Sequence, residues 1–337
     1  MKIIRFLKTD VKIINSYFLI AVILIILISV GYFSYALFSF TKTSNNVIEG
    51  TVGELKKSGT DTLIKLTDNK DNSGLYTITH EADNTLQIGA NESITEYRYR
   101  GASPKNYVTF NNEVWRILGV FPTDDGTGNI ENRIKIIRDQ SIGNYQWNTT
   151  QVASTSSYNN WTGATLMKYL NGTYYNSLTN DNSIDMVDDV KYYLGGFNAV
   201  NATIENMYGY ERKISGNNTY YYRTNPNSWT GKLALMYASD YGYAASDECT
   251  QTLVNYDNAT CKNNNWLYNI KVSEWILPQD ASNSSSAFYV SSGGGVYRSD
   301  FYVIADQFAV RPVLYLISSV QIAGGNGTSS SPYTLGL

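Results

Sequence analysis

The stretch QFAVRPVLYLIS, residues 307–318, decides the fold. Apolar side chains dominate it and predict a buried strand near the end of the chain. Arg311 interrupts these side chains with a charge, and Pro312 follows it directly. Proline donates no backbone hydrogen bond, which keeps it at edges, strand starts or bulges. We therefore predict that residues 310–316 form the closing strand of a sheet, with Pro312 at an edge or a bulge.

Two roles fit Arg311, whose guanidinium carries five hydrogen-bond donors on a long apolar stem. In the first role, the guanidinium holds a ligand or takes part in catalysis. In the second, it ties nearby carbonyl groups and an acid, such as Asp300 or Asp306, into the core of the domain. We expect the second, structural role, so that Arg311→Ala destabilises the protein.

Strands are also indicated upstream of the opening stretch. Residues 113–121 and 132–139 read as strands on either side of the glycine-bearing turn PTDDGTGN, which predicts a β-meander. Further strand-like segments run from residue 231 to the opening stretch. The chain therefore begins and ends its folded part with strands.

Two helices are expected between these groups of strands. In residues 161–178, Leu and Tyr recur every four positions and form one apolar stripe. In residues 182–196, Ser183 supplies an N-cap, aspartates follow it, and two glycines end the segment. Strands, two main helices and further strands predict an α+β fold with a mostly antiparallel sheet.

The N-terminal region predicts a membrane anchor. Residues 17–40 carry no charge over 24 positions, enough for a helix to cross a hydrocarbon core of about 30 Å. Basic residues precede this segment, so the N-terminus is expected inside and the rest of the chain outside. A cleaved signal peptide is the alternative, with Ser34 and Ala36 before the cleavage site. The length of the apolar run favours an uncleaved transmembrane signal-anchor helix.

This reading divides the chain into four parts. Residues 1–16 are expected to be a cytoplasmic N-terminus, and residues 17–40 the transmembrane helix. Residues 41–95 are expected to form a stalk with a hairpin, and residues 96–337 an extracellular domain. The protein is therefore expected at the cell membrane, crossing it once.

Composition narrows the classes of function. The net charge is only −3, and the chain holds 29 Tyr but one His, so no electrostatic footprint for nucleic acid is present. The single histidine, His80, lies beside Glu81 and Asp83, and we expect it to be a turn or surface residue rather than the base of a nucleophile-base-acid triad. Hydrolysis by two carboxylates stays open, because 29 acidic residues are available and their spacing is not visible in the sequence.

The two cysteines, Cys249 and Cys261, are expected to form a disulfide in an exported domain. Two free thiols or half of a metal site are the alternatives. No second pair of Cys or His is available to complete tetrahedral ligation. We therefore predict a disulfide, no metal site and no cofactor.

Seven segments in a fixed order carry a resemblance to a known family. The segments are YRYRGASPKNYVTFNNEVWRILGVF, IKIIRDQSIGNYQW, LMKYLNGTYYNSL, GKLALMYASDYGYA, SEWILP, VRPVLYL and GGNGTSSSPYTL. With these segments the chain resembles, over residues 95–335, a family of uncharacterised exported or membrane-anchored proteins of low-GC Gram-positive bacteria.

The C-terminal half is more distantly similar to C-type-lectin-like domains of the formylglycine-generating-enzyme type. That resemblance implies a C-type-lectin-like domain with two main helices and a last strand that carries the arginine. The chain departs from the oxidase branch, which holds copper with paired cysteines, and from the calcium-dependent lectins, whose loop motifs it lacks. The resemblance therefore implies a fold and does not assign an activity.

Tryptophans in polar surroundings are the candidate binding residues. Trp147, Trp161 and Trp266 lie among Asn and Tyr, and such side chains can stack on sugar rings or on a protein partner. Filling the core of a loop-rich domain is the alternative role for each of them. The binding role predicts exposed indole rings.

The function predicted from the sequence is a membrane-anchored extracellular binding or adhesion module without catalysis. Its partner is expected to be a glycan or a surface protein, with residues 17–40 in the membrane and no nucleic acid bound. A cell-surface glycan-acting hydrolase with two carboxylates is one alternative. A structural surface protein that assembles with itself is the other.

Overall fold

The computed structural model describes residues 22–29, 57–149, 157–198, 201–299 and 303–337. The chain divides into two units, residues 1–56 and 57–337. In the first unit, residues 22–29 form a helix. The remainder of the predicted anchor 17–40, and the residues on either side of it, lie outside the described residues.

The predicted membrane anchor is corrected by the structure. Over the described part of the chain, no helix is both long enough and apolar enough to cross a membrane. This finding does not support a transmembrane helix at residues 17–40, a single-pass location in the cell membrane, or an extracellular placement derived from it.

The larger sheet of the second unit has seven strands, in the order β1-β2-β4-β5-β14-β9 with β3 paired to β4. Each of its strand pairs is antiparallel. The long strands β4 and β5 form the predicted meander, joined through the turn at residues 125–129. Its strands are β1 Tyr76–His80, β2 Ile94–Arg98, β3 Tyr107–Phe110, β4 Glu113–Asp124, β5 Ile130–Arg138, β9 Leu233–Ala234 and β14 Val313–Tyr315.

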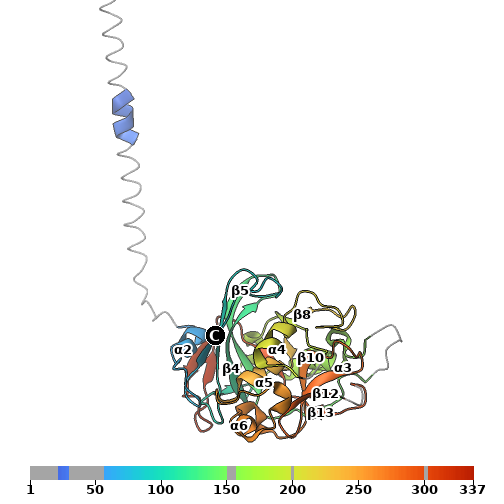
Figure 1. Cartoon of the computed structure of the whole chain (residues 1–337). Helices are drawn as coiled ribbons and strands as arrows, with labels where there is room; N and C mark the ends of the chain where they lie inside the picture. The colour runs from blue at the N-terminus through green and yellow to red at the C-terminus, as the bar shows by residue number, and fades with distance from the viewer. Residues whose placement is uncertain (1–21, 30–56, 150–156, 199–200, 300–302) are drawn as a thin grey trace, which may run out of the picture. The chain divides into compact units, whose positions relative to one another are not determined.

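A five-stranded sheet lies on the other side of the unit, in the order β12-β11-β10-β13-β6 (Figure 1). Its β10–β13 pair is parallel, and the other pairs are antiparallel. Two further sheets have two strands each, β15 with β16 and β7 with β8. The remaining strands are β6 Asn144–Tyr145, β7 Val190–Tyr193, β8 Ser228–Gly231, β10 Glu274–Gln279, β11 Ala287–Val290, β12 Val296–Arg298, β13 Phe308–Ala309, β15 Gln321–Gly324 and β16 Thr334–Gly336.

Helices in the second unit are short. The α-helices are α2 Gly59–Ile64, α3 Thr165–Tyr169, α4 Ile204–Glu211, α5 Ala238–Tyr243 and α6 Ala259–Lys262. The structure is therefore mostly sheet with few helices. This corrects the predicted fold class, an α+β C-type-lectin-like domain with two main helices behind a transmembrane segment.

Both predicted helices differ from the structure. Residues 161–178 contain the short helix α3 and the π-turn Leu170–Tyr174, flanked by 3-10 turns. Gly172 and the β-branched Thr173 lie where the α-helix gives way, and both residue types weaken a helix. In residues 182–196 only Ser183–Met186 is helical, as a 3-10 turn.

The second half of that predicted helix is a strand. Val190–Tyr193 forms β7 and pairs with β8. Val190, Tyr192 and Tyr193 are buried there, and β-branched and aromatic residues suit a strand packed on both sides. Within residues 41–95, where a stalk with a hairpin was expected, Gly59–Ile64 forms helix α2, and β1 further along pairs with β2.

The opening stretch links the two sheets. Phe308–Ala309 forms β13 in the five-stranded sheet, and Val313–Tyr315 forms β14 in the seven-stranded sheet. Arg311 and Pro312 lie between them, so the missing N–H of the proline interrupts neither ladder. The predicted closing strand 310–316 is thus shorter, and β14 lies between β5 and the edge strand β9 of its sheet.

Candidate functional site

A group of charged side chains lies inside the second unit, and we call it the charge cluster. Strand β2 supplies two of its members from one face, β1 supplies the histidine and β5 a lysine, and the others come from helices α4 and α5 and from the residue directly after α4. All are almost completely buried except the histidine, whose side chain is 12% exposed. The members are His80, Glu96, Arg98, Lys135, Glu211, Arg212 and Asp240.

Ion pairs connect the acids and bases of the charge cluster. Arg98 lies between two acids, with Nη2 2.7 Å from Oε2 of Glu96 and Nη1 2.9 Å from Oδ1 of Asp240. The other carboxylate oxygen of Asp240 is 2.5 Å from Nζ of Lys135. Asp240 also accepts a hydrogen bond from the backbone N–H of Tyr237. Each charge therefore has a partner of opposite sign, as buried charges require.

The arrangement shifts the pKa values of the charge cluster. Burial alone would raise the pKa of Asp240, and the nearby charges of Lys135 and Arg98 outweigh it and hold that pKa below its ordinary value. The pKa of Glu96 is held low in the same way, chiefly by Arg98 against burial. Burial lowers the pKa of Lys135 to about 8. Glu96 and Asp240 are thus ionised at neutral pH and hold no proton for general acid catalysis.

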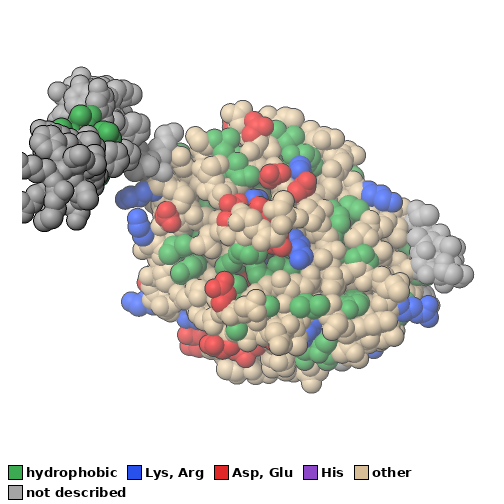
Figure 2. All heavy atoms as spheres, turned by 90° about the horizontal axis from the view of Figure 1, so that it is seen from above, with side chains coloured by type: hydrophobic (Ala, Val, Ile, Leu, Met, Phe, Trp, Pro, Cys, Tyr) green, Lys and Arg blue, Asp and Glu red, His purple; other side chains and the backbone are tan. Residues whose placement is uncertain are grey.

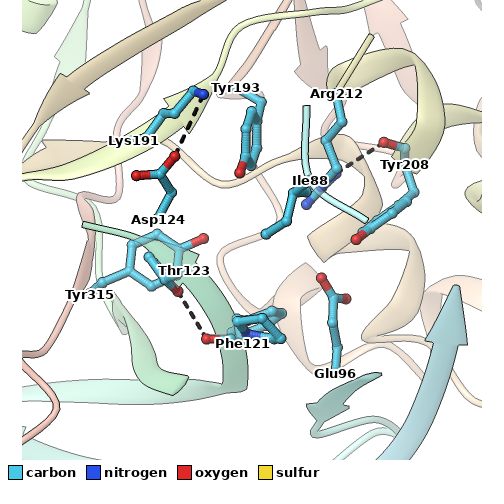
Figure 3. Close-up of a pocket in the computed structure, with 11 residues that line it drawn as sticks. Ile88, Glu96, Phe121, Thr123, Asp124, Lys191, Tyr193, Tyr208, Arg212 and Tyr315 are labelled. Atoms are coloured by element: carbon cyan, nitrogen blue, oxygen red, sulfur yellow. Dashed lines mark hydrogen bonds and ion pairs between the residues drawn. The ribbon is translucent and has the colours of Figure 1, made fainter. Parts of the chain in front are cut away.

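A small pocket opens beside the charge cluster (Figure 3). Lys191 and Asp124 lie at one side of it, with Nζ 3.6 Å from Oδ2, while Tyr193 and Tyr208 turn their rings toward its centre. The hydroxyl of Tyr193 is buried and has no hydrogen-bond partner among the described residues. The cavity measures about 10 Å³, which is the room that one water molecule needs. The pocket is therefore too small for an organic ligand.

Arg311 belongs to a second buried ion pair. Its Nε and Nη2 donate to the two carboxylate oxygens of Glu274, each at 2.7 Å. Nη1 donates to the side chain of Asn269, and Nη2 also donates to the carbonyl of Leu267. Asp300, one of the acids expected beside it, lies outside the described residues. This geometry agrees with the structural role, since every donor group of Arg311 is turned into the protein.

The three candidate tryptophans lie in the core. Trp147 is fully buried, and Trp161 and Trp266 are each 2% exposed. Trp147 and Trp161 contact each other edge to face at 5.2 Å between ring centroids. Trp266 lies apart from them and donates from Nε1 to the carbonyl of Tyr99. None of the three rings presents a face to solvent in this structure, and their packing is that of core residues.

Cys249 and Cys261 form the predicted disulfide. It joins the end of the loop after α5 to helix α6 and closes a short loop. Among the described residues no group of His, Cys, Asp or Glu side chains is placed to hold a metal ion.

An open hollow of about 550 Å³ lies between α2 and the β15–β16 hairpin. Its size falls within the range of ligand pockets, about 300–1,000 Å³. Tyr99 and Tyr333 line it together with Ile322 and Leu66, and polar side chains surround these apolar groups. We call it the tyrosine groove. Its polar lining residues are Thr62, Asp68, Ser73, Lys105 and Asn326.

Two glycines let the chain form the walls of the tyrosine groove. A Cβ on Gly74 would come within 1.6 Å of the carbonyl oxygen of Leu66, so only glycine lets this turn close against the residues after α2. Gly325 has a φ of +81°, and a Cβ there would meet the carbonyl oxygen of Pro332 at 2.0 Å. The groove thus depends on the backbone as well as on its side chains.

The hydroxyl of Tyr99, which lines the tyrosine groove, is incompletely hydrogen-bonded. Tyr99 is 2% exposed, and its hydroxyl interacts with Tyr333 without forming a hydrogen bond of full geometry. Burial raises the pKa of Tyr99 well above the ordinary value, and the interaction with Tyr333 raises it further. A buried hydroxyl without a full hydrogen bond is costly, and a hydroxyl group of a bound ligand is one way to satisfy it.

A second hollow of about 290 Å³ lies next to the same hairpin. Thr334 and Leu335 of β16 line it together with Phe110 of β3 and with residues near the 3-10 turn Ser183–Met186. The sequence showed neither hollow as a site. Its one signal was the segment GGNGTSSSPYTL, whose glycines Gly324, Gly325 and Gly327 lie at the end of β15 and in the turn beside the tyrosine groove.

The surface and the comparisons add two findings. Figure 2 shows acidic and basic side chains near one another among hydrophobic ones, and no large area of a single charge sign on that face.

No protein-family model, no curated protein and no solved structure matches this chain. The family resemblance inferred from the sequence therefore stays a prediction.

Proposed function

We propose that the second unit is a binding module without catalysis, and that it holds a glycan in the tyrosine groove. The observation that carries this proposal is the groove itself, a hollow of about 550 Å³ with two tyrosines among its lining residues. It is large enough for a ligand, unlike the pocket at the charge cluster.

The lining of the tyrosine groove suits a sugar. A sugar ring has an apolar face, and its hydroxyl groups both donate and accept hydrogen bonds. Tyr99 and Tyr333 offer aromatic surface with polar edges. Lys105 donates, Asp68 accepts, and Asn326 does both. Because the groove holds one acid and one base, it favours a ligand rich in hydroxyl groups over a strongly charged one.

The carboxylates do not favour the hydrolase alternative. Hydrolysis by two carboxylates needs both of them in one cleft, about 5–10 Å apart. Among the described lining residues, the tyrosine groove contains one acid, Asp68, and the second hollow contains one, Asp181. In the charge cluster, Glu96 and Asp240 are paired with Arg98 and buried.

The experiment is a binding measurement with the full chain. Oligosaccharides of glucose, mannose and N-acetylglucosamine are titrated into the protein by calorimetry. Leu66 lines the groove and is 42% exposed, so Leu66→Ala removes ligand contact with little effect on folding. We expect it to cost about 1 kcal/mol of binding, roughly a fivefold loss of affinity.

The matched control is Ile130→Ala. Ile130 is 46% exposed and does not line the groove, so this variant should bind as the wild type does. Absence of binding to every oligosaccharide, or equal losses in the two variants, would refute the proposal. Binding of an unstructured peptide pool in place of the sugars would also refute it and point to a protein partner.

A further inference from the structure

The two hollows beside the C-terminal hairpin are neighbours. Ile322 of β15 lines the tyrosine groove, and Leu335 of β16 lines the second hollow. These residues are direct partners in the antiparallel β15–β16 pair. Directly opposed side chains lie on one face of a hairpin, with Cβ atoms about 4.5–5.5 Å apart. A single cross-strand pair therefore forms the ridge between the hollows.

Strand β16 also runs from one hollow toward the other. Tyr333, just before β16, lines the tyrosine groove, and Leu335 lines the second hollow. Residues two apart in extended chain share a face and lie about 6–7 Å apart. Strand β3 runs alongside, since Thr109 donates from N–H to the carbonyl of Tyr333 at 2.9 Å and Tyr333 donates to Tyr107 at 2.8 Å. The hollows thus follow one another along the same strands.

The second hollow has lining groups similar to those of the tyrosine groove. Ser183, Asp181 and Thr334 supply hydroxyl and carboxylate groups, and Phe110 and Leu335 supply apolar surface. Asp181 is the one charged residue among its described lining residues. A second unit of the same polymer, with hydroxyl groups around an apolar ring face, would meet the same kinds of group in this hollow.

We infer that the two hollows are consecutive subsites of one site, which takes a linear glycan lying across the Ile322–Leu335 ridge. This inference rests on the proposed function, because it concerns the ligand of the tyrosine groove. A chain that reaches both hollows contacts more surface than one confined to the groove. Affinity for the longer chain is then higher by the contacts that the second subsite adds.

The test compares chain lengths with the full-length protein. For the sugar that binds in the panel above, oligomers of one to six units are titrated. We expect the affinity of the hexamer to exceed that of the dimer at least tenfold. Thr334 is exposed and lines the second hollow, so Thr334→Trp fills that hollow from its rim.

Thr334→Trp should lower the affinity for the hexamer about tenfold and leave the affinity for the dimer unchanged. The control is Thr77→Trp, an exposed threonine on β1 that lines neither hollow, and it should bind both oligomers as the wild type does. Thermal melts of the two tryptophan variants check that they are equally folded.

Two results overturn the inference and are distinguishable from failure of the proposed function. Equal affinities for dimer and hexamer, or a hexamer affinity that Thr334→Trp leaves unchanged, refute the second subsite. If Leu66→Ala still weakens binding in that case, the tyrosine groove stands as the site. If no oligomer of any length binds, both the proposed function and the inference fail.

Discussion

The charge cluster and the tyrosine groove contain similar residue types and use them differently. In the cluster, aromatic rings lie against the protein's own cations. The guanidinium carbon of Arg212 is 3.6 Å from the ring centroid of Tyr208, and Nζ of Lys135 is 4.3 Å from that of Tyr237. In the groove, the tyrosines border an open volume.

The two regions differ in where the interaction partners of their polar groups come from. Each charge of the cluster finds its opposite inside the chain, so the cluster is closed and neutral, with room for about one water beside it. The groove leaves a tyrosine hydroxyl without a hydrogen bond of full geometry among the described residues and has space for a ligand. Polar groups that are satisfied internally stabilise a fold, whereas polar groups left open beside a cavity suit binding.

Asp240→Ala should produce the largest effect. It leaves Lys135 and Arg98 as buried charges without their shared acid and removes the acceptor for the N–H of Tyr237. Breaking a buried ion pair in this way costs about 3–5 kcal/mol. Chemical denaturation should show that loss in the free energy of unfolding.

The corresponding change in the groove is Asp68→Ala. Asp68 is exposed, and its carboxylate accepts hydrogen bonds from residues of its own turn. The free energy of unfolding should therefore fall by about 1 kcal/mol or less. The contrast between the regions would break down if Asp240→Ala cost no more than Asp68→Ala.

Acid should affect folding before it affects binding. The folded-state pKa values of Glu96 and Asp240 lie below their ordinary values, so their stabilisation is complete above the unfolded pKa of about 4 and is lost as pH falls toward the folded values. The free energy of unfolding should therefore decrease steadily below about pH 5. Affinity for a neutral sugar should stay constant over the range in which the protein remains folded.

Lys135 adds a second rise of stability with pH, at alkaline pH. Burial lowers its folded pKa to about 8, below the unfolded value of about 10.4. The unfolded state then binds more protons between these values, so the contribution of Lys135 to stability rises with pH from about 8 to 10. Lys135→Met should remove this rise.

At acid pH, a free energy of unfolding that stays constant from pH 5 to 2 would contradict the ionised state of the acids in the charge cluster.

Strand segments were predictable where alternation was regular, and the longest example is the β4–β5 meander around its glycine-bearing turn. The disulfide Cys249–Cys261 was predictable because no other cysteine competes. The helix predicted at residues 182–196 was wrong, because apolar residues in its second half form strand β7. The partner of this strand, β8, lies about 40 residues further along the chain. Such long-range pairing leaves no local signal.

The site was less predictable than the strands. Tryptophans among asparagines suggested an exposed binding face, but Trp147 and Trp161 pack against each other in the core. The tyrosine groove combines residues from α2, from the end of β2 and from the C-terminal hairpin. Only the fold brings these segments together, so no spacing in the sequence marks them. Arg311 differs from the groove residues, because the apolar residues on either side of it in the sequence already indicated that it is buried.

The smallest and most direct change is Tyr99→Phe, measured for both stability and affinity. Removing a buried hydroxyl that forms no hydrogen bond of full geometry with a described residue should change the free energy of unfolding by less than about 0.5 kcal/mol or raise it. If a ligand hydroxyl supplies the partner, affinity for the bound oligosaccharide should fall by about 1 kcal/mol, roughly fivefold. Unchanged affinity, with or without a loss of stability above about 1 kcal/mol, would contradict the assignment of the tyrosine groove as the binding site.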